Sequence, residues 1–222
     1  MRAMILAAGR GERMGALTAD LPKPLLKAGK NYLIEYSILS LVKIGILDIV
    51  INISYCAGQI KTALGDGSRY GVRFYYSEEP DVLETGGGIL NALPLLGDEP
   101  FIVLSSDIIT DYPLQKLFLR PDMLAHLILV DNPSFHPSGD FCLQDEKLSL
   151  AFQNQFSFGN IGIYHPDLFS GYQPGKFRLG GVLKEAISKE KITGEHYQGI
   201  WHNIGTPEDL SRCLINSFDS AF

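Results

Sequence analysis

The sequence predicts an α/β fold with a Rossmann-like, mixed but mostly parallel sheet and helices on both faces of that sheet. Short apolar runs alternate with stretches whose apolar residues recur at helical spacing throughout the first half of the chain. Loops rich in glycine or charged residues follow three of these runs, and ligands bind at such loops in open parallel sheets. The length, 222 residues, suits one large α/β domain.

The first half is expected to supply the parallel strands, joined by right-handed crossover helices. Its predicted strands are Met4–Ala8, Asp48–Ser54, Val72–Ser77 and Phe101–Ser105, and its predicted helices are Leu33–Ile44, Gly58–Leu64 and Gly88–Leu96. The loops expected to carry the site follow the strands at Gly9–Pro22, Ser77–Gly87 and Ser105–Asp111. Asp111 itself is expected to cap a helix that follows Pro113.

The second half is expected to complete a mixed sheet. We predict a strand at Leu124–Val130, a hairpin over Asp140–Leu150 turning at Asp145-Glu146, a strand at Phe158–Tyr164, a helix at Val182–Lys189, a strand pair around Glu195–Ile204 and a helix at Pro207–Asn216 with Thr206 as its N-cap. Glycines inside the strand at Phe158–Tyr164 indicate close approach of a ligand or of another backbone. No repeat or linker divides the chain, so residues 1–222 are expected to form a single domain.

Composition excludes several classes of protein. The formal net charge is -6, from 25 acidic and 19 basic residues, and no basic run is present, so no nucleic-acid partner is expected. The three cysteines lack metal or redox spacing. No apolar run has membrane-spanning length, and the N-terminus does not resemble a signal peptide. We therefore expect a soluble cytoplasmic protein without a membrane partner.

The opening segment indicates a binding site for several phosphates. Gly9 and Gly11 follow the first strand and can bring bare backbone N–H groups to an anion. Arg10 and Arg13 add guanidinium groups, and Lys23 stands between two prolines that are expected to hold it extended. A Rossmann fingerprint would need a third glycine, and a Walker loop would need Gly-Lys-Ser/Thr, and neither is present.

Leu-Ala-Ala-Gly-x-Gly-x-Arg-Met, followed by Pro-Lys-Pro-Leu, resembles the signature of the sugar-1-phosphate nucleotidyltransferases. The segments Leu83–Gly88, Leu64–Arg69, Leu129–Pro133 and Gly139–Phe141 bring the chain closest to the N-acetylmuramate α-1-phosphate uridylyltransferases. The resemblance covers nearly the whole length. It implies the nucleotide-diphospho-sugar transferase type of fold, with a nucleotide-binding half at 1–120 and a sugar-binding half at 121–222.

The resemblance also implies roles for individual residues. The backbone from Leu6 through Ala7, Ala8, Gly9 and Arg10 to Gly11 would hold the nucleotide, as would Thr85, Gly86 and Gly87 in a second glycine-rich loop. Arg13 would neutralise the triphosphate, and Lys23 would grip the phosphate under attack. Glu84, Asp140 and Asn160 would bind the sugar, although polar turn and strand residues are an almost equal interpretation of the last two. Asp107 would bind Mg²⁺, whereas the sequence alone leaves an Asx turn or helix cap equally open.

One position departs from the family pattern. The segment Trp201–Thr206 aligns with Trp-x-Asp-x-Gly-Thr, in which the family's Asp completes the Mg²⁺ site, and here that position is Asn203. An amide oxygen brings no charge, and Mg²⁺ prefers carboxylates and water. A weaker metal site is therefore expected, with Asp107 and Asn203 as its ligands.

The function implied is Mg²⁺-dependent joining of UTP and N-acetylmuramic acid α-1-phosphate, in recycling of cell-wall sugar. One alternative keeps the chemistry with glucose or mannose 1-phosphate and dTTP or GTP, or with phosphocholine and CTP. Another alternative is a non-catalytic nucleotide-sugar sensor that has lost its metal site. The expected partners are a nucleoside triphosphate and a sugar 1-phosphate, and the oligomeric state stays open.

Overall fold

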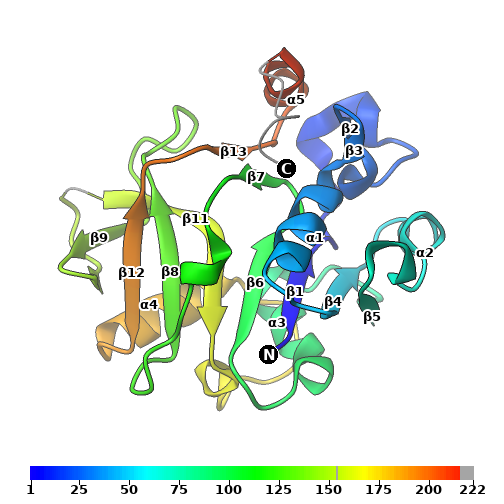
Figure 1. The fold of residues 1–222 in the computed structure, drawn as a ribbon. Helices are drawn as coiled ribbons and strands as arrows, with labels where there is room; N and C mark the ends of the chain where they lie inside the picture. The colour runs from blue at the N-terminus through cyan, green and yellow to red at the C-terminus, as the bar shows by residue number, and fades with distance from the viewer. Residues whose placement is uncertain (154, 216–222) are drawn as a thin grey trace.

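A computed structural model describes residues 1–153 and 155–215. Its core is one nine-stranded sheet in the order β5-β4-β1-β6-β11-β8-β12-β10-β9 (Figure 1). The strands of this sheet are β1 (Ala3–Leu6), β4 (Asp48–Ile53), β5 (Arg73–Glu78), β6 (Phe101–Ser105), β8 (Ala125–Val130), β9 (Phe141–Gln144), β10 (Lys147–Ser149), β11 (Gln155–Tyr164) and β12 (Ile192–Tyr197). Two small ladders, β2 (Lys27–Ala28) with β3 (Asn31–Tyr32) and β7 (Ile108–Thr110) with β13 (Trp201–Asn203), lie outside it.

Strands β5, β4, β1 and β6 run parallel to one another, as predicted for the first half. Strand β11 is antiparallel to both β6 and β8, whereas β8 and β12 are parallel, so the sheet is mixed. The predicted turn at Asp145-Glu146 is confirmed, because it joins the antiparallel strands β9 and β10 and both residues have positive φ. The predicted pair around 195–204 is wrong, since β12 pairs with β8 while β13 pairs with β7.

Helices cover both faces of the sheet, as the sequence predicts. The helices of the described residues are α1 (Leu33–Lys43), α2 (Ala57–Leu64), α3 (Glu84–Leu96), α4 (Leu179–Ser188) and α5 (Pro207–Ile215), and α5 packs against the short strands β2 and β13 outside the nine-stranded sheet. Ile5 of β1 packs with Ile34 and Ile38 of α1 in one core, while its neighbour Met4 packs with Ile89 of α3 in another. This alternation follows from the two-residue period of a strand. The C-terminal end of the predicted last helix, Asn216, lies outside the described residues.

Three local expectations about loops are wrong. Lys23 begins a single 3₁₀ turn, Lys23–Leu25, after an extended Pro22, because Pro24 falls at an early helical position that tolerates proline. No long helix follows Pro113, only the 3₁₀ turn Leu114–Lys116, and Asp111 does not cap it. Instead, Asp111 Oδ1 accepts hydrogen bonds from the Tyr197 hydroxyl and, at 2.7 Å, from the Ile200 N–H.

The second glycine-rich segment is helical, whereas a loop was predicted. Gly86, Gly87 and Gly88 are buried in the first turns of α3. A Cβ on Gly86 would lie 2.6 Å from the Phe177 ring, and one on Gly87 would lie 2.1 Å from the Gly175 carbonyl oxygen. The Gly87 N–H donates to the Phe177 carbonyl at 3.1 Å. The glycines therefore let the segment around 175–177 pack directly on the helix backbone.

We expect Gly87→Ala to lower the free energy of unfolding by about 1–3 kcal/mol or more, since the new methyl group meets a backbone oxygen that cannot rotate away. Urea or thermal unfolding would measure this loss. Gly58→Ala in α2 is the matched control. Its Cβ would meet nothing within 4 Å, so a gain of about 0.4–1 kcal/mol is expected there. Equal stability of the two variants would contradict the packing role of Gly87.

Candidate active site

A cleft of about 860 Å³ opens where strands β1 and β6 end. It is lined by most of the residues that the sequence singles out, namely Leu6, Ala7, Ala8, Gly9, Arg10, Gly11, Arg13, Lys23, Glu84, Thr85, Asp107 and Asn160. Gly86 and Gly87 do not line it and lie buried within α3. Asp140 and Asn203 line a smaller neighbouring cavity of about 320 Å³, here called the side pocket.

The two halves of the opening motif meet at Gly11. This residue adopts φ 68°, and a Cβ on it would lie 2.9 Å from the Cβ of Lys23. The Gly11 carbonyl accepts hydrogen bonds from the Met14 N–H at 2.8 Å and from the Thr18 hydroxyl at 3.0 Å. Glycine is therefore required at position 11 both for the left-handed turn and for close contact with Lys23.

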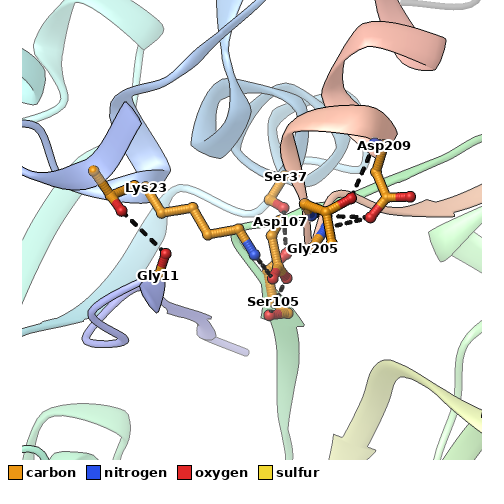
Figure 2. A network of polar contacts seen from close by, with 9 residues as sticks. Gly11, Lys23, Ser37, Ser105, Asp107, Gly205 and Asp209 are labelled. Atoms are coloured by element: carbon orange, nitrogen blue, oxygen red, sulfur yellow. Dashed lines mark hydrogen bonds and ion pairs between the residues drawn. The ribbon is translucent and has the colours of Figure 1, made fainter. Parts of the chain in front are cut away.

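Lys23 and Asp107 form an ion pair inside the cleft (Figure 2). Lys23 Nζ lies 2.5 Å from Asp107 Oδ2, and the Ser105 hydroxyl donates to Asp107 Oδ1 at 2.6 Å. The Lys23 side chain is 11 % exposed and that of Asp107 is 21 % exposed. Both groups face the cleft and are partly screened from water, so an entering phosphate or cation would compete for them in a setting where charge interactions are stronger than in bulk water.

Asn203 is brought to Asp107 by the β7–β13 ladder. Asn203 pairs with Ile108 in this ladder, and the Ile204 N–H donates to the Asp107 carbonyl at 2.9 Å. Asn203 Oδ1 is buried and has no hydrogen-bond partner among the described residues. A buried hydrogen-bond acceptor without a partner is unfavourable unless a ligand donates a hydrogen bond to it or it binds a metal ion. Burial also lowers the pKa of the neighbouring His202, so this imidazole is neutral at pH 7.

The chain after Asn203 is fixed by the start of α5. Asp209 Oδ2 accepts from the N–H groups of Gly205 and Thr206, at 3.1 and 2.9 Å. The Thr206 hydroxyl accepts from the Asp209 N–H at 3.2 Å, which confirms Thr206 as the predicted N-cap. The Arg13 guanidinium lies over Gly205, 3.3 Å from where a Cβ would stand. Arg13 therefore borders the region that contains Asn203.

A buried polar network that the sequence analysis missed supports the first loop. Asn52 Oδ1 accepts from the Ala7 N–H at 2.8 Å, and its amide group donates to Glu79 Oε1 at 2.7 Å. Glu79, 3 % exposed, also accepts from the Leu83 N–H at 2.9 Å. The network ties the end of β1 to the start of α3. The available signal was Asn52, the one polar side chain among the buried residues Ile49–Ile53 of β4. Lys176, which also lines the cleft, stands in no motif.

Asn160 stands between the two cavities and lines both. It adopts φ 56° where the pairing of β11 with β8 shifts register between Phe158 and Gly162. The bulge re-aims the side chain out of the sheet. A Cβ on Gly159 would lie 3.0 Å from the Ile128 carbonyl oxygen, and the Gly159 carbonyl accepts from the Trp201 indole at 2.9 Å. The close backbone approach predicted from these glycines is confirmed.

The Asp140 carboxylate is held by the protein itself. Oδ2 accepts from the Phe158 N–H at 2.8 Å, and Oδ1 lies 3.1 Å from His136 Nε2. Each oxygen thus has one partner, so Asp140 shapes the side pocket whether or not it touches a ligand.

Among the residues described, no cluster of three or more His, Cys, Asp or Glu side chains could hold a metal ion. In the same part of the chain, no helix is long and apolar enough to cross a membrane.

Comparisons with known proteins identify the family to which the chain belongs. Residues 2–130 match the family model described as "Nucleotidyl transferase". The chain is 43 % identical over 216 residues to the N-acetylmuramate alpha-1-phosphate uridylyltransferase of Neisseria meningitidis, covering 93 % of this chain and 94 % of the relative. It is 30 % identical to the D-glycero-alpha-D-manno-heptose 1-phosphate guanylyltransferase of Campylobacter jejuni, covering 98 % of this chain and 100 % of that one.

A solved structure supports the fold. The inositol-1-phosphate CTP transferase of T. maritima superposes with a TM-score of 0.81 at 19 % identity, covering 96 % of this chain and 95 % of that one. The predicted fold class and the predicted family resemblance are both confirmed.

Proposed function

The chain belongs to the nucleotidyl transferase family, and from that premise we propose that it joins UTP to N-acetylmuramic acid α-1-phosphate, forming the UDP-sugar and pyrophosphate. The single observation that carries the reaction class is the cleft in which a backbone loop, Arg13, Lys23 and Asp107 converge at the strand ends. The choice of substrates is supported by the identity of 43 % to a relative with that name.

In this reaction an oxygen of the sugar phosphate forms a bond to the α-phosphorus of UTP, and the bond from that phosphorus to the bridging β-oxygen breaks. Both reactants are anionic, so the protein must offset their repulsion and hold them in line. The N–H groups from Leu6 to Gly11 would bind the nucleotide. Lys23 would neutralise the α-phosphate, and Arg13 would neutralise the departing pyrophosphate. Thr85 and Glu84, at the start of α3, would contact the nucleotide and the sugar.

The residues at the end of β6 and in β13 suit Mg²⁺. Asp107 offers a carboxylate, and Asn203 offers a buried amide oxygen that lacks a partner in the described structure. Oxygen ligands of this kind are those that Mg²⁺ takes, alongside phosphates and water. When bound, the metal would supply positive charge at the phosphates. Asp107 would exchange its ion pair with Lys23 for that role, which frees the ammonium group for the α-phosphate.

Replacing Asn203 by aspartate is expected to tighten metal binding by about tenfold, because a carboxylate adds a charge next to Asp107. Titration of activity with Mg²⁺ and direct binding of Mn²⁺ followed by electron paramagnetic resonance would both measure it. Asn31→Asp, in β3 and away from both cavities, is the matched control. Unchanged half-saturation in Asn203→Asp would contradict the assignment of Asn203 as a ligand.

The proposal extends to the organisation and the setting of the protein. We treat residues 1–222 as one domain in which 1–120 binds the nucleotide and 121–222 binds the sugar through Asn160 and Asp140. The reaction would serve recycling of peptidoglycan sugar in the cytoplasm, where UTP is available. These assignments are supported by the same cleft and side pocket, both of which Asn160 lines.

Release of pyrophosphate, measured with several nucleoside triphosphates against several sugar 1-phosphates at varied Mg²⁺, tests the function. Release with UTP and N-acetylmuramic acid 1-phosphate is expected. Release only with another pair, such as GTP with mannose 1-phosphate or CTP with phosphocholine, would keep the chemistry and overturn the substrates. Binding of UTP without turnover at any Mg²⁺ or Mn²⁺ concentration would favour a nucleotide-sugar sensor, the alternative that Asn203 supports.

A further inference from the structure

The side pocket adjoins the main cleft through Glu84, Thr85 and Asn160, which line both cavities. Its walls combine rings and aliphatic groups, including Phe135, Phe158 and Trp201, with the polar or charged side chains of Glu84, His136, Asp140 and Arg178. A substituent of a ligand in the cleft could therefore extend past Asn160 into a space that is partly apolar and partly charged. The charged side chains of the side pocket determine which charge on that substituent is favourable.

The acidic groups of the side pocket are already paired. Asp140 contacts His136 at 3.1 Å and accepts from the Phe158 backbone at 2.8 Å, so this carboxylate and its imidazole partner satisfy each other. Glu84 lies 3.8 Å from the Nε of Arg178. That distance is too long for a hydrogen bond, and the Arg178 side chain is 85 % exposed, so the pair holds the guanidinium only loosely. Arg178 is thus the cation of this pocket with donor groups to spare.

Arg178 also lies at a position whose electrostatic environment favours an anion. It is the N-cap residue of α4, and no side chain of the described residues caps this helix. No acidic residue stands in its first turn, and a Cβ on Gly180 would meet nothing within 4 Å. The start of a helix adds a favourable potential for negative charge to that of the guanidinium. Planar carboxylates fit the arginine fork with two parallel hydrogen bonds.

We propose that the side pocket binds a short branch of the sugar that ends in a carboxylate, and that Arg178 determines specificity by binding this carboxylate. This inference rests on the proposed function and deepens it, because N-acetylmuramate carries such a branch, a lactyl ether with a methyl group and a carboxylate. The methyl group would contact the apolar wall at Phe158 and Trp201, and the carboxylate would bind the guanidinium. A sugar phosphate without the branch would leave the side pocket filled by water.

The test compares N-acetylmuramic acid 1-phosphate with N-acetylglucosamine 1-phosphate, which lacks the lactyl group, both with UTP. Arg178→Ala is expected to lower the ratio of kcat/KM for these two substrates by about 10- to 100-fold, the worth of a charge-assisted hydrogen-bonded pair. The loss should fall in the KM for the muramate, since the branch stands away from the reacting phosphate. Arg178→Lys should recover part of it. Lys184→Ala, an exposed cation elsewhere on α4, is the matched control.

A second measurement uses one sugar only. The methyl ester of the lactyl carboxylate should lower kcat/KM of the wild-type protein by the same factor as Arg178→Ala, and should lower that of the variant by less than about threefold. An ester effect of equal size in both proteins would overturn the role of Arg178 while leaving the proposed function intact. Wild-type protein that turns over only sugar 1-phosphates without a carboxylate would overturn both. Thermal unfolding of Arg178→Ala separates lost recognition from lost folding.

Discussion

Replacing Asp107 by asparagine is expected to lower kcat on the order of 10³-fold, with the fold unchanged. The substitution keeps the shape of the side chain and the contact with Ser105, which lies 2.6 Å from Oδ1. It removes the carboxylate that pairs with Lys23 and that we assign to the metal. The loss should therefore appear in the chemical step and in metal affinity together.

For the same variant we expect no loss of affinity for UTP in the absence of metal, in contrast to the loss of kcat. Without the negative charge of Asp107, the cleft becomes more positive, so UTP should bind at least as tightly as to the wild type when no metal is present. Calorimetry in the presence of a chelator would measure this, and electron paramagnetic resonance of Mn²⁺ would report the metal. Asp98→Asn, exposed before β6, controls for the change in net charge. Near-full activity of Asp107→Asn would contradict its place at the reacting phosphates.

The sequence was sufficient to predict those features of the fold and site that depend on the local pattern of residues. The parallel strands follow from apolar runs, and the cleft follows from the loops after β1 and β6, because parallel strands end at the same edge. The two halves of the opening motif, which were predicted to form one phosphate-binding segment, do meet in the structure, where Gly11 lies against Lys23. These predictions need no knowledge of distant contacts.

Other features depend on contacts between segments far apart in sequence. The glycines of α3 were predicted to form a loop because the backbone segment that packs on them, Gly175 to Phe177, comes some ninety residues later in the sequence. Asp111 was predicted to be a helix cap because its actual partners, Tyr197 and Ile200, come 86 and 89 residues later in the sequence. The Asn52–Glu79 network and Lys176 were missed for the same reason. Patterns of residue type record periodicity and turns, but not which remote backbone approaches.

Lys23→Ala is expected to lower kcat by about 10²- to 10³-fold, the usual effect of removing one preorganised charge at a site of charge development. The Lys23 side chain is 11 % exposed and its Nζ lies 2.5 Å from Asp107 Oδ2, so its position is fixed before substrate arrives. Its loss also leaves Asp107 as an uncompensated carboxylate facing the triphosphate. UTP binding without metal should therefore weaken, the reverse of the expectation for Asp107→Asn. This opposition distinguishes a cation that acts on phosphate from one that only supports the fold.

Lys23→Arg is expected to recover little of the activity lost in Lys23→Ala. The stem of Lys23 passes within contact distance of Gly11, and the planar guanidinium is larger than an ammonium group and cannot replace it as a point charge. Lys27→Ala, which removes the same charge four residues away and outside the cleft, is the matched control and should retain activity. Single-turnover kinetics would assign the loss to chemistry. If Lys23→Ala kept near-wild-type rates, Lys23 would be a structural partner of Asp107 alone, and neutralisation of the α-phosphate would have to come from Arg10, Arg13 or Lys176, which line the same cleft.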